Sequence, residues 1–175
     1  TDPDPAGGTF SALLEAAFSS GLPAVADADG LNHMARRREL LKKLHGRIIL
    51  TPHSGEAARL ARKTTGEILQ DPLTMARAMA EDWGCVVLLK GTVTVISGPE
   101  GTYLTAEGNG GLAKGGSGDT LTGLILAMLC QGRSPTEGAC LGSWLLGVSA
   151  EKAFALLKER MLRASDLAAA LKTME

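Results

Sequence analysis

The chain has 175 residues, enough for one domain with a substantial hydrophobic core. Hydrophobic residues make up 45% and charged residues 21%, as in ordinary globular proteins, and the net charge of -1 gives no electrostatic basis for binding nucleic acid or an anionic membrane. The apolar stretch Leu121–Cys130 is too short to span a bilayer, and we recognise no signal peptide. The widely spaced Cys85, Cys130 and Cys140 are expected to be buried thiols in a reducing compartment. We therefore predict a cytoplasmic protein.

Apolar periodicity and capping residues divide the chain into alternating helices and strands. The run at 85–89 is continuously apolar, which is typical of a strand covered on both faces. The segment 92–97 alternates instead, and turn residues follow it. In chain order we expect a helix from Thr9 to Gly21, a strand at 23–27, a helix capped by Asp29 or Asn32 that includes 35–44, a strand at 47–50, helices at 54–63 and 71–82, strands at 85–89, 92–97 and 102–105, helices at 118–131 and 134–159, and a last helix capped by Ser165.

This order predicts an α/β fold with a largely parallel central sheet and a β-hairpin inserted after the third strand. We expect a single domain over residues 1–175. Ligands of such sheets bind beyond the carboxyl ends of the strands. Polar residues that directly follow strand ends are therefore candidates for a binding site, and they are Asp27, Asp29, His53, Glu56 and Lys90.

The segment Gly108–Gly123, GNGGLAKGGSGDTLTG, is rich in glycine and leads into an apolar helix. Glycine lets backbone N–H groups converge on an anion, and the N-terminus of the following helix adds a positive potential. The segment has neither the Walker pattern nor the dinucleotide-binding spacing. It predicts a phosphate-binding loop, with a tight structural turn as the alternative.

Asp119 falls in the first turn of that helix, where a base would accept a proton from an attacking hydroxyl. The alternative is an acid that only interacts with the helix dipole. Lys90 could neutralise phosphate while Thr92 and Thr94 offer hydroxyls to a nucleotide, or Lys90 could simply extend from a strand end into solvent.

His53 and Glu56 are three residues apart at the start of a helix. This spacing occurs in metal sites, but two ligands do not make one, and a Glu here is equally a capping residue. We therefore predict no metal ion held by protein ligands alone.

Five segments, in the same order, resemble the ADP/ATP-dependent NAD(P)H-hydrate dehydratases of the ribokinase-like superfamily: AVADADGLN, TPHSGEAARL, VVLLKGTVTVI, GNGGLAKGGSGDTLTG and MLRASDLAAAL. The resemblance covers residues 23–171 and implies a ribokinase-like three-layer α/β/α fold. It also implies a hydro-lyase that repairs NAD(P)HX, the hydrated form of NADH or NADPH, with ADP or ATP as co-substrate and Mg²⁺ bound to the nucleotide. The ring hydroxyl would be phosphorylated, and elimination of phosphate would restore the nicotinamide.

The same resemblance assigns roles to residues. Asp119 is the catalytic base and contacts the hydrated ring. The other expected contacts to NAD(P)HX are His53, Glu56 and Arg59. The expected contacts to the nucleotide are Lys90, Gly91, Thr92, Val93, Thr94, Gly115, Gly116, Ser117 and Gly118. Members of the family are often tetrameric, so a homo-oligomer is expected.

The chain departs from the family pattern at its start, where members carry a further part of the domain, including strands of the same sheet. We therefore expect either a fragment or a chain that a partner completes, with one sheet edge unpaired. Lys114 also replaces a small polar residue of the family's loop. Two other functions stay open: a ribokinase-like kinase for a vitamin-precursor alcohol, and a non-catalytic nucleotide-binding module.

Overall fold

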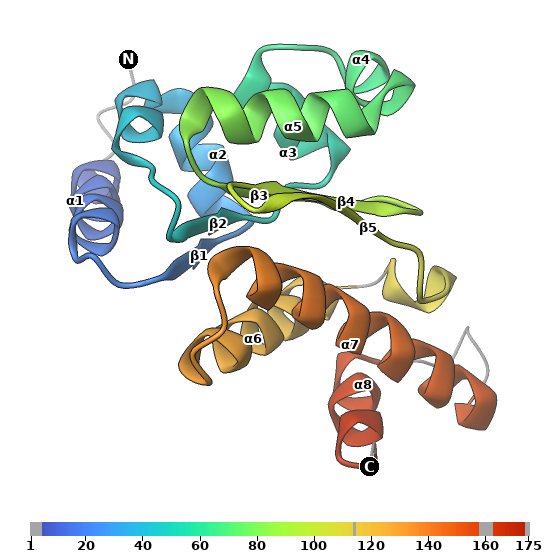
Figure 1. Cartoon of the computed structure of the whole chain (residues 1–175). Coiled ribbons are helices and arrows are strands. Elements are labelled where there is room, and N and C mark those ends of the chain that lie inside the picture. The colour runs from blue at the N-terminus through green and yellow to red at the C-terminus, as the bar shows by residue number, and fades with distance from the viewer. Residues whose placement is uncertain (1–4, 114, 158–162, 174–175) are drawn as a thin grey trace.

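A computed structural model describes residues 5–113, 115–157 and 163–173 and shows one five-stranded sheet between two layers of helices (Figure 1). The strands lie in the sheet in chain order: β1 (Ala24–Ala26), β2 (Ile48–Leu50), β3 (Val86–Leu89), β4 (Thr94–Gly98) and β5 (Gly101–Thr105). β1, β2 and β3 pair in parallel, whereas the pairs β3–β4 and β4–β5 are antiparallel. All the strands except β4 therefore run in one direction, as the predicted α/β fold requires.

Helices cover both faces of the sheet (Figure 1). One layer contains α2 (Asp29–Arg36), the 3₁₀ helix η1 (Arg38–Lys43), α3 (Ser54–Ala61), α4 (Thr65–Gln70) and α5 (Pro72–Trp83). The other contains α6 (Ser117–Cys130), α7 (Pro135–Leu157) and α8 (Ala164–Leu171), with a short 3₁₀ helix, η2 (Gly110–Leu112), in the loop before α6. The first helix, α1 (Pro5–Ser19), packs at the side against η1 and α2.

The two faces of the sheet supply two separate hydrophobic cores. Successive side chains of a strand point to opposite faces, so Ile48 and Leu50 pack with the α2–α5 layer while Ile49 packs with α6 and α7. β3 divides in the same way, with Val87 on the first face and Leu88 on the second. This double coverage explains why the run at 85–89 shows no polar alternation.

Several predicted helix boundaries are wrong. Thr9 lies inside α1 rather than at its cap, and the helix expected over 35–44 is broken at Arg37 into α2 and η1. The break allows the adjacent Leu40 and Leu41 both to be buried. α4 was not predicted, although Thr64 and Glu67 form a capping box that begins it.

The C-terminal helices differ in detail from the prediction. α8 begins after Arg163, whose backbone N–H donates to the Asp166 carboxylate over 2.7 Å, so Ser165 is not its cap. α7 is described as far as Leu157, and the predicted end at Glu159 lies outside the described residues. The predicted hairpin is present as β4–β5 and extends the main sheet by antiparallel pairing.

Within the described residues, β1 pairs only with β2 and so forms an edge of the sheet. No helix in this part of the chain is long and apolar enough to cross a membrane. Of the three thiols, Cys85 is buried, Cys140 is half-buried and Cys130 is exposed, so the expectation of three buried cysteines is wrong for Cys130.

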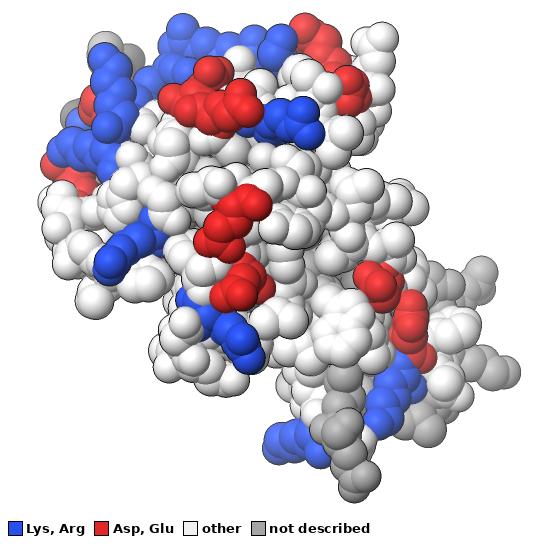
Figure 2. Space-filling model, viewed as in Figure 1, with Lys and Arg blue, Asp and Glu red and all other residues white. Residues whose placement is uncertain are grey.

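Charges of both signs share the face seen in Figure 2, where basic side chains gather over the layer that contains α2 and α5. Two cations of the charge run at 36–43 have partners. Arg37 pairs with Glu39 over 2.7 Å, and Lys43 pairs with Glu15 over 2.8 Å. The charged residues at 36–43 are mostly exposed, while Leu40 and Leu41 are buried.

Candidate functional site

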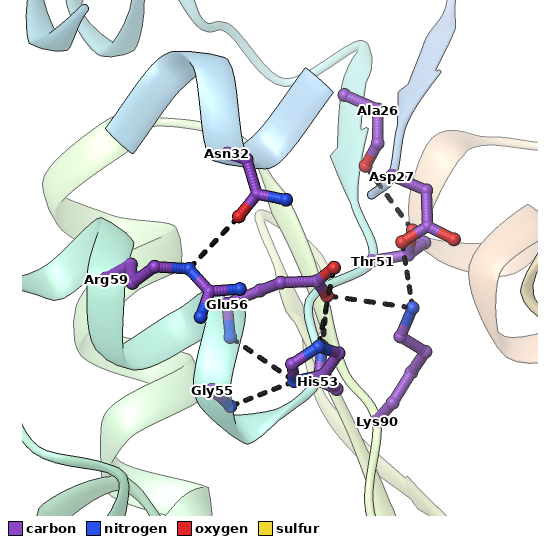
Figure 3. A network of polar contacts seen from close by, with 9 residues as sticks. All are labelled: Ala26, Asp27, Asn32, Thr51, His53, Gly55, Glu56, Arg59 and Lys90. Atoms are coloured by element: carbon purple, nitrogen blue, oxygen red, sulfur yellow. Dashed lines mark hydrogen bonds and ion pairs between the residues drawn. The ribbon is translucent and has the colours of Figure 1, made fainter. Parts of the chain in front are cut away.

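Lys90 and Asp27 meet at the carboxyl ends of the parallel strands (Figure 3). Asp27 directly follows β1 and Lys90 directly follows β3, so the lysine side chain reaches across the end of the intervening strand β2. Its Nζ donates to Oδ1 of Asp27 over 2.8 Å and lies 3.9 Å from Oε2 of Glu56. The backbone N–H of Lys90 donates to the Pro52 carbonyl over 2.8 Å, which fixes the base of the side chain.

His53 and Glu56 hold the first turn of α3 (Figure 3). The His53 Nδ1 atom accepts from the backbone N–H groups of Gly55 and Glu56 at 3.0 and 3.3 Å. Oε2 of Glu56 accepts from the His53 backbone N–H over 2.8 Å, which completes a capping box. Because Nδ1 is an acceptor, a neutral ring carries its proton on Nε2, which lies 3.5 Å from Oε1 of Glu56. The capping role and a binding role for these two residues are compatible.

We call Asp27, His53, Glu56 and Lys90 the strand-end cluster. Its charged groups are largely withdrawn from solvent: the exposed fraction of the side chain is 25% for Lys90, 16% for Asp27 and 7% for Glu56. Two carboxylates thus share one ammonium group in a partly dehydrated setting, where charge–charge interactions are stronger than at the surface. The cluster is suited to exchange one cation for another, or to orient an ammonium toward an incoming anion.

The N-terminus of α6 comes directly against this cluster. A β-carbon on Gly118 would lie 2.9 Å from Oδ2 of Asp27 and 3.9 Å from Nζ of Lys90. The end of a helix of this length offers unpaired N–H groups and a positive potential to an anion. The predicted phosphate loop and the strand-end residues therefore belong to one site.

Neighbouring elements hold the glycine loop in place. Glu151 on α7 accepts from the Gly108 N–H over 3.0 Å, and the Asn109 side chain donates to the Ala150 carbonyl over 3.0 Å. Gly116 has a φ of 89° and lies against α8, where a β-carbon would be 2.9 Å from that of Ala164. The ASDL segment thus packs against the loop, so two of the five family-like segments meet in space.

Asp119 is exposed in the first turn of α6, next to Gly118. Ser117 is buried at the start of the same helix, and Gly115 is exposed with open space where a side chain would be. Lys114 lies outside the described residues. The loop therefore presents an accessible carboxylate beside backbone N–H groups, the arrangement expected of a base at a phosphate site.

The other predicted residues lie in the turn after Lys90, at the start of β4 and on α3. Gly91, Thr92 and Val93 are exposed in the turn between Lys90 and β4, and Thr94 is the first residue of β4. Arg59 donates from Nε to Oδ1 of Asn32 over 3.0 Å, which links α3 to α2 (Figure 3).

Two residues gain importance from the structure. Asp27 was suggested by its place after a strand, but the resemblance assigned it no role. Asn32 was considered only as a helix cap, and no sequence signal connects it to Arg59, 27 residues away. Asp29 begins α2 and is exposed.

Two described cavities lie away from this cluster. A cavity of about 570 Å³ is lined by residues of α5 and of the β4–β5 hairpin, and another of about 470 Å³ lies between that hairpin and the start of α7. Neither is lined by a residue of the strand-end cluster. The strand-end cluster is therefore identified by its chemistry, since it combines partly buried charges with a helix N-terminus.

Comparison with known families gives one match over nearly the whole chain. The sequence model of a family described as NAD(P)H-hydrate dehydratase matches residues 5–173. Among curated proteins, the chain is 44% identical over 147 residues to the bifunctional NAD(P)H-hydrate repair enzyme of Moorella thermoacetica, covering 83% of the chain and 28% of that protein. It is 40% identical over 132 residues to the ADP-dependent (S)-NAD(P)H-hydrate dehydratase of Neisseria meningitidis, covering 74% of the chain and 45% of that protein. The match thus spans less than half the length of either relative.

Solved structures show the same relationship. The ADP/ATP-dependent NAD(P)H-hydrate dehydratase of Bacillus subtilis, co-crystallized with ATP and Mg²⁺, superposes with a TM-score of 0.73 at 36% identity, covering 85% of the chain and 52% of that structure. A ribokinase-like superfamily protein of Enterococcus faecalis gives a TM-score of 0.77 at 21% identity, covering 99% of the chain and 58% of that structure. This second likeness concerns the fold alone, and it confirms the predicted ribokinase-like α/β architecture.

Proposed function

Because the chain belongs to the NAD(P)H-hydrate dehydratase family, we propose that it converts NAD(P)HX to NAD(P)H at the expense of ADP or ATP. The observation that carries the proposal is the approach of Gly118, at the N-terminus of α6, to Asp27 and Lys90. That approach supports a site that combines an anion-binding helix end, an ammonium group and the carboxylate of Asp119. These are the groups that phosphoryl transfer to a hydroxyl requires.

The proposed reaction has two steps. Asp119 accepts the proton of the ring hydroxyl as its oxygen attacks the terminal phosphorus, and the shortened nucleotide leaves as ADP from ATP or AMP from ADP. The carbon–oxygen bond of the phosphorylated ring then breaks, inorganic phosphate departs, and loss of a proton from the neighbouring ring carbon restores the double bond. The net change is one hydrolysed phosphoanhydride for each water removed from the ring.

The residues around the loop suit a nucleotide. Gly118 lacks a side chain where the backbone meets Asp27, which keeps the start of α6 close to the strand-end cluster, and Gly116 lets the loop pack against Ala164. Lys90 supplies positive charge, and the segment from the exposed Gly91 to the half-buried Thr94 extends from it as the nucleotide-binding stretch. We assign Gly115, Gly116, Ser117 and Gly118 to the phosphates, and His53, Glu56 and Arg59 to the hydrate.

The site also suits a nucleotide-bound Mg²⁺. Among the described residues, no three His, Cys, Asp or Glu side chains lie together as a metal site. Mg²⁺ retains several waters and binds readily through phosphates, so the carboxylates of Asp27 and Glu56 are sufficient protein acceptors beside it. When bound, the ion would neutralise charge that develops on the transferred phosphoryl group.

We extend the proposal to the setting of the protein. The described strands form one sheet, which supports a single domain over residues 1–175. A cytoplasmic location is supported by three cysteines that form no disulfide in the structure. We also propose a homo-oligomer, on the strength of the family resemblance.

The test uses the full-length protein with NADPHX and either ADP or ATP in the presence of Mg²⁺. Recovery of the reduced-nicotinamide absorbance, with one phosphate released per molecule, is expected. A preparation that binds nucleotide yet restores no absorbance would contradict the proposal. A stable phosphorylated product from an alcohol substrate would instead support the kinase alternative.

A further inference from the structure

Ala28 has a backbone conformation that favours glycine. Its φ is 46° and its ψ is -112°, and the Gly30 N–H donates to the Asp27 carbonyl over 3.0 Å. These features define a type II′ turn over 27–30, whose second residue is normally glycine because a β-carbon is crowded at positive φ. Ala28 is exposed, so burial of its methyl group offers little compensation. The turn is therefore strained.

The strained residue directly follows Asp27, whose carboxylate holds Lys90. On the other side of Asp27, the Ala26 carbonyl accepts from the backbone N–H and the hydroxyl of Thr51 at 3.1 and 3.3 Å (Figure 3). That anchor is buried and belongs to the sheet. A backbone adjustment of Asp27 is therefore easier on the Ala28 side, where the strain is.

Lys90 has two competing demands. In the structure its ammonium group is engaged by Asp27 at 2.8 Å and lies 3.9 Å from Glu56. In the proposed function the same group neutralises the phosphates of a nucleotide. The Asp27–Lys90 pair must therefore loosen when the nucleotide binds, and strain that disfavours the paired state makes that change easier.

We propose that Ala28 is a positioning residue that tunes nucleotide binding by weakening the hold of Asp27 on Lys90. This inference rests on the proposed function, because it requires a nucleotide at the α6 N-terminus. Glycine at position 28 removes the strain and stabilises the paired state. A nucleotide that binds only when the Asp27–Lys90 pair is released must then overcome this added stability of the paired state. Its affinity falls by the corresponding amount, because a ligand shifts a two-state equilibrium only through its different affinities for the two states.

The test compares Ala28→Gly with a matched control in the full-length protein. Arg62, at the end of α3, is the other non-glycine residue with positive φ among the described residues, at 55°. Both Ala28→Gly and Arg62→Gly are expected to raise the Tm, each by about 2–4 °C. Only Ala28→Gly is expected to raise the Kd for Mg-ATP, measured by calorimetry, by roughly 5- to 10-fold.

A double-mutant cycle with Asp27→Asn separates this mechanism from a general effect on the site. With the carboxylate neutralised, Lys90 is no longer held by an ion pair, so adding Ala28→Gly should change the Kd by less than about twofold. An unchanged Kd in the single Ala28→Gly variant, or a lowered Tm, would overturn the inference and leave the proposed function standing. A wild-type protein that binds no nucleotide would overturn both.

Discussion

The α-carbon of Gly118 lies so close to Asp27 that a β-carbon there would be only 2.9 Å from Oδ2. The obstructing atom belongs to a short side chain whose other oxygen already pairs with Lys90 over 2.8 Å. The carboxylate therefore has little freedom to move aside. Glycine at this position is what allows the positive end of α6 to reach the strand-end cluster.

Replacing Gly118 by Ala is expected to weaken nucleotide binding by about tenfold, since the added methyl group displaces either the helix end or the Asp27–Lys90 pair. Calorimetric titration with Mg-ATP checks this. Gly123→Ala is the matched control, because Gly123 lies in the same helix and has open space where the methyl group would be. Equal losses of affinity in the two variants would show that helix α6 itself, rather than the contact with Asp27, is being perturbed.

Asp119→Asn is expected to lower kcat by about 10²- to 10⁴-fold, the range for loss of a general base. The Kd for nucleotide should stay within about threefold, because the amide keeps the size of the side chain and the backbone N–H groups are untouched. Steady-state assays with NADPHX and binding measurements are run on the same preparations. Glu137→Gln is the control, because Glu137 is also an exposed acidic residue in the first turn of a helix, α7. A kcat near the wild-type value would exclude Asp119 as the base.

Lys90→Met should lower the free energy of unfolding by about 1–3 kcal/mol, because it leaves two carboxylates without their shared ammonium group. This expected loss of stability is smaller than that for breaking a fully buried ion pair, because the Lys90 side chain is 25% exposed. Denaturant titration measures the change. Lys63→Met removes an exposed lysine 3.8 Å from Glu67 and should cost less than about 0.5 kcal/mol. Similar losses in both variants would mean that the strand-end cluster contributes no more than a surface ion pair.

Much of this site could be predicted from sequence because each part has a local signal. Lys90 and His53 follow apolar runs, and Gly118 belongs to an evident glycine loop. The contact between Asp27 and Gly118 joins residues 91 positions apart, and its distance depends on how α6 packs beneath β1. Likewise, the conformation of Ala28 is fixed by tertiary structure and opposes its local preference. At such strained positions, the local conformational preference of the residue predicts the wrong backbone conformation.

The thiols should differ sharply in their reaction with an alkylating reagent at pH 8. Burial raises the pKa of Cys85 to about 12, and burial together with the carboxylates of Glu100 and Glu137 raises the pKa of Cys140 to about 11. Because the thiolate is the reacting species, both should react slowly, while the exposed Cys130 reacts first. Mass spectrometry of timed samples identifies the modified cysteine. Cys130→Ser should abolish the fast phase, and a fast phase that persists in this variant would contradict the assignment.

Helices α6 and α7 pack closely at Gly142. A β-carbon on Gly142 would lie 2.7 Å from Cγ1 of Ile125, 3.1 Å from its backbone nitrogen and 3.2 Å from its Cα. A side-chain rotation relieves only the first contact, so the two helices must move apart.

We therefore expect Gly142→Ala to lower the free energy of unfolding by about 1–3 kcal/mol. It should also raise the KM for nucleotide, because α6 carries Ser117 and Gly118 at its N-terminus. Thermal unfolding and steady-state kinetics test the two effects, with Gly123→Ala as the reference for adding a methyl group to an open position of α6. A destabilised variant with an unchanged KM would show that the loop is positioned by its own contacts to Glu151 and Ala150 rather than by the helix crossing.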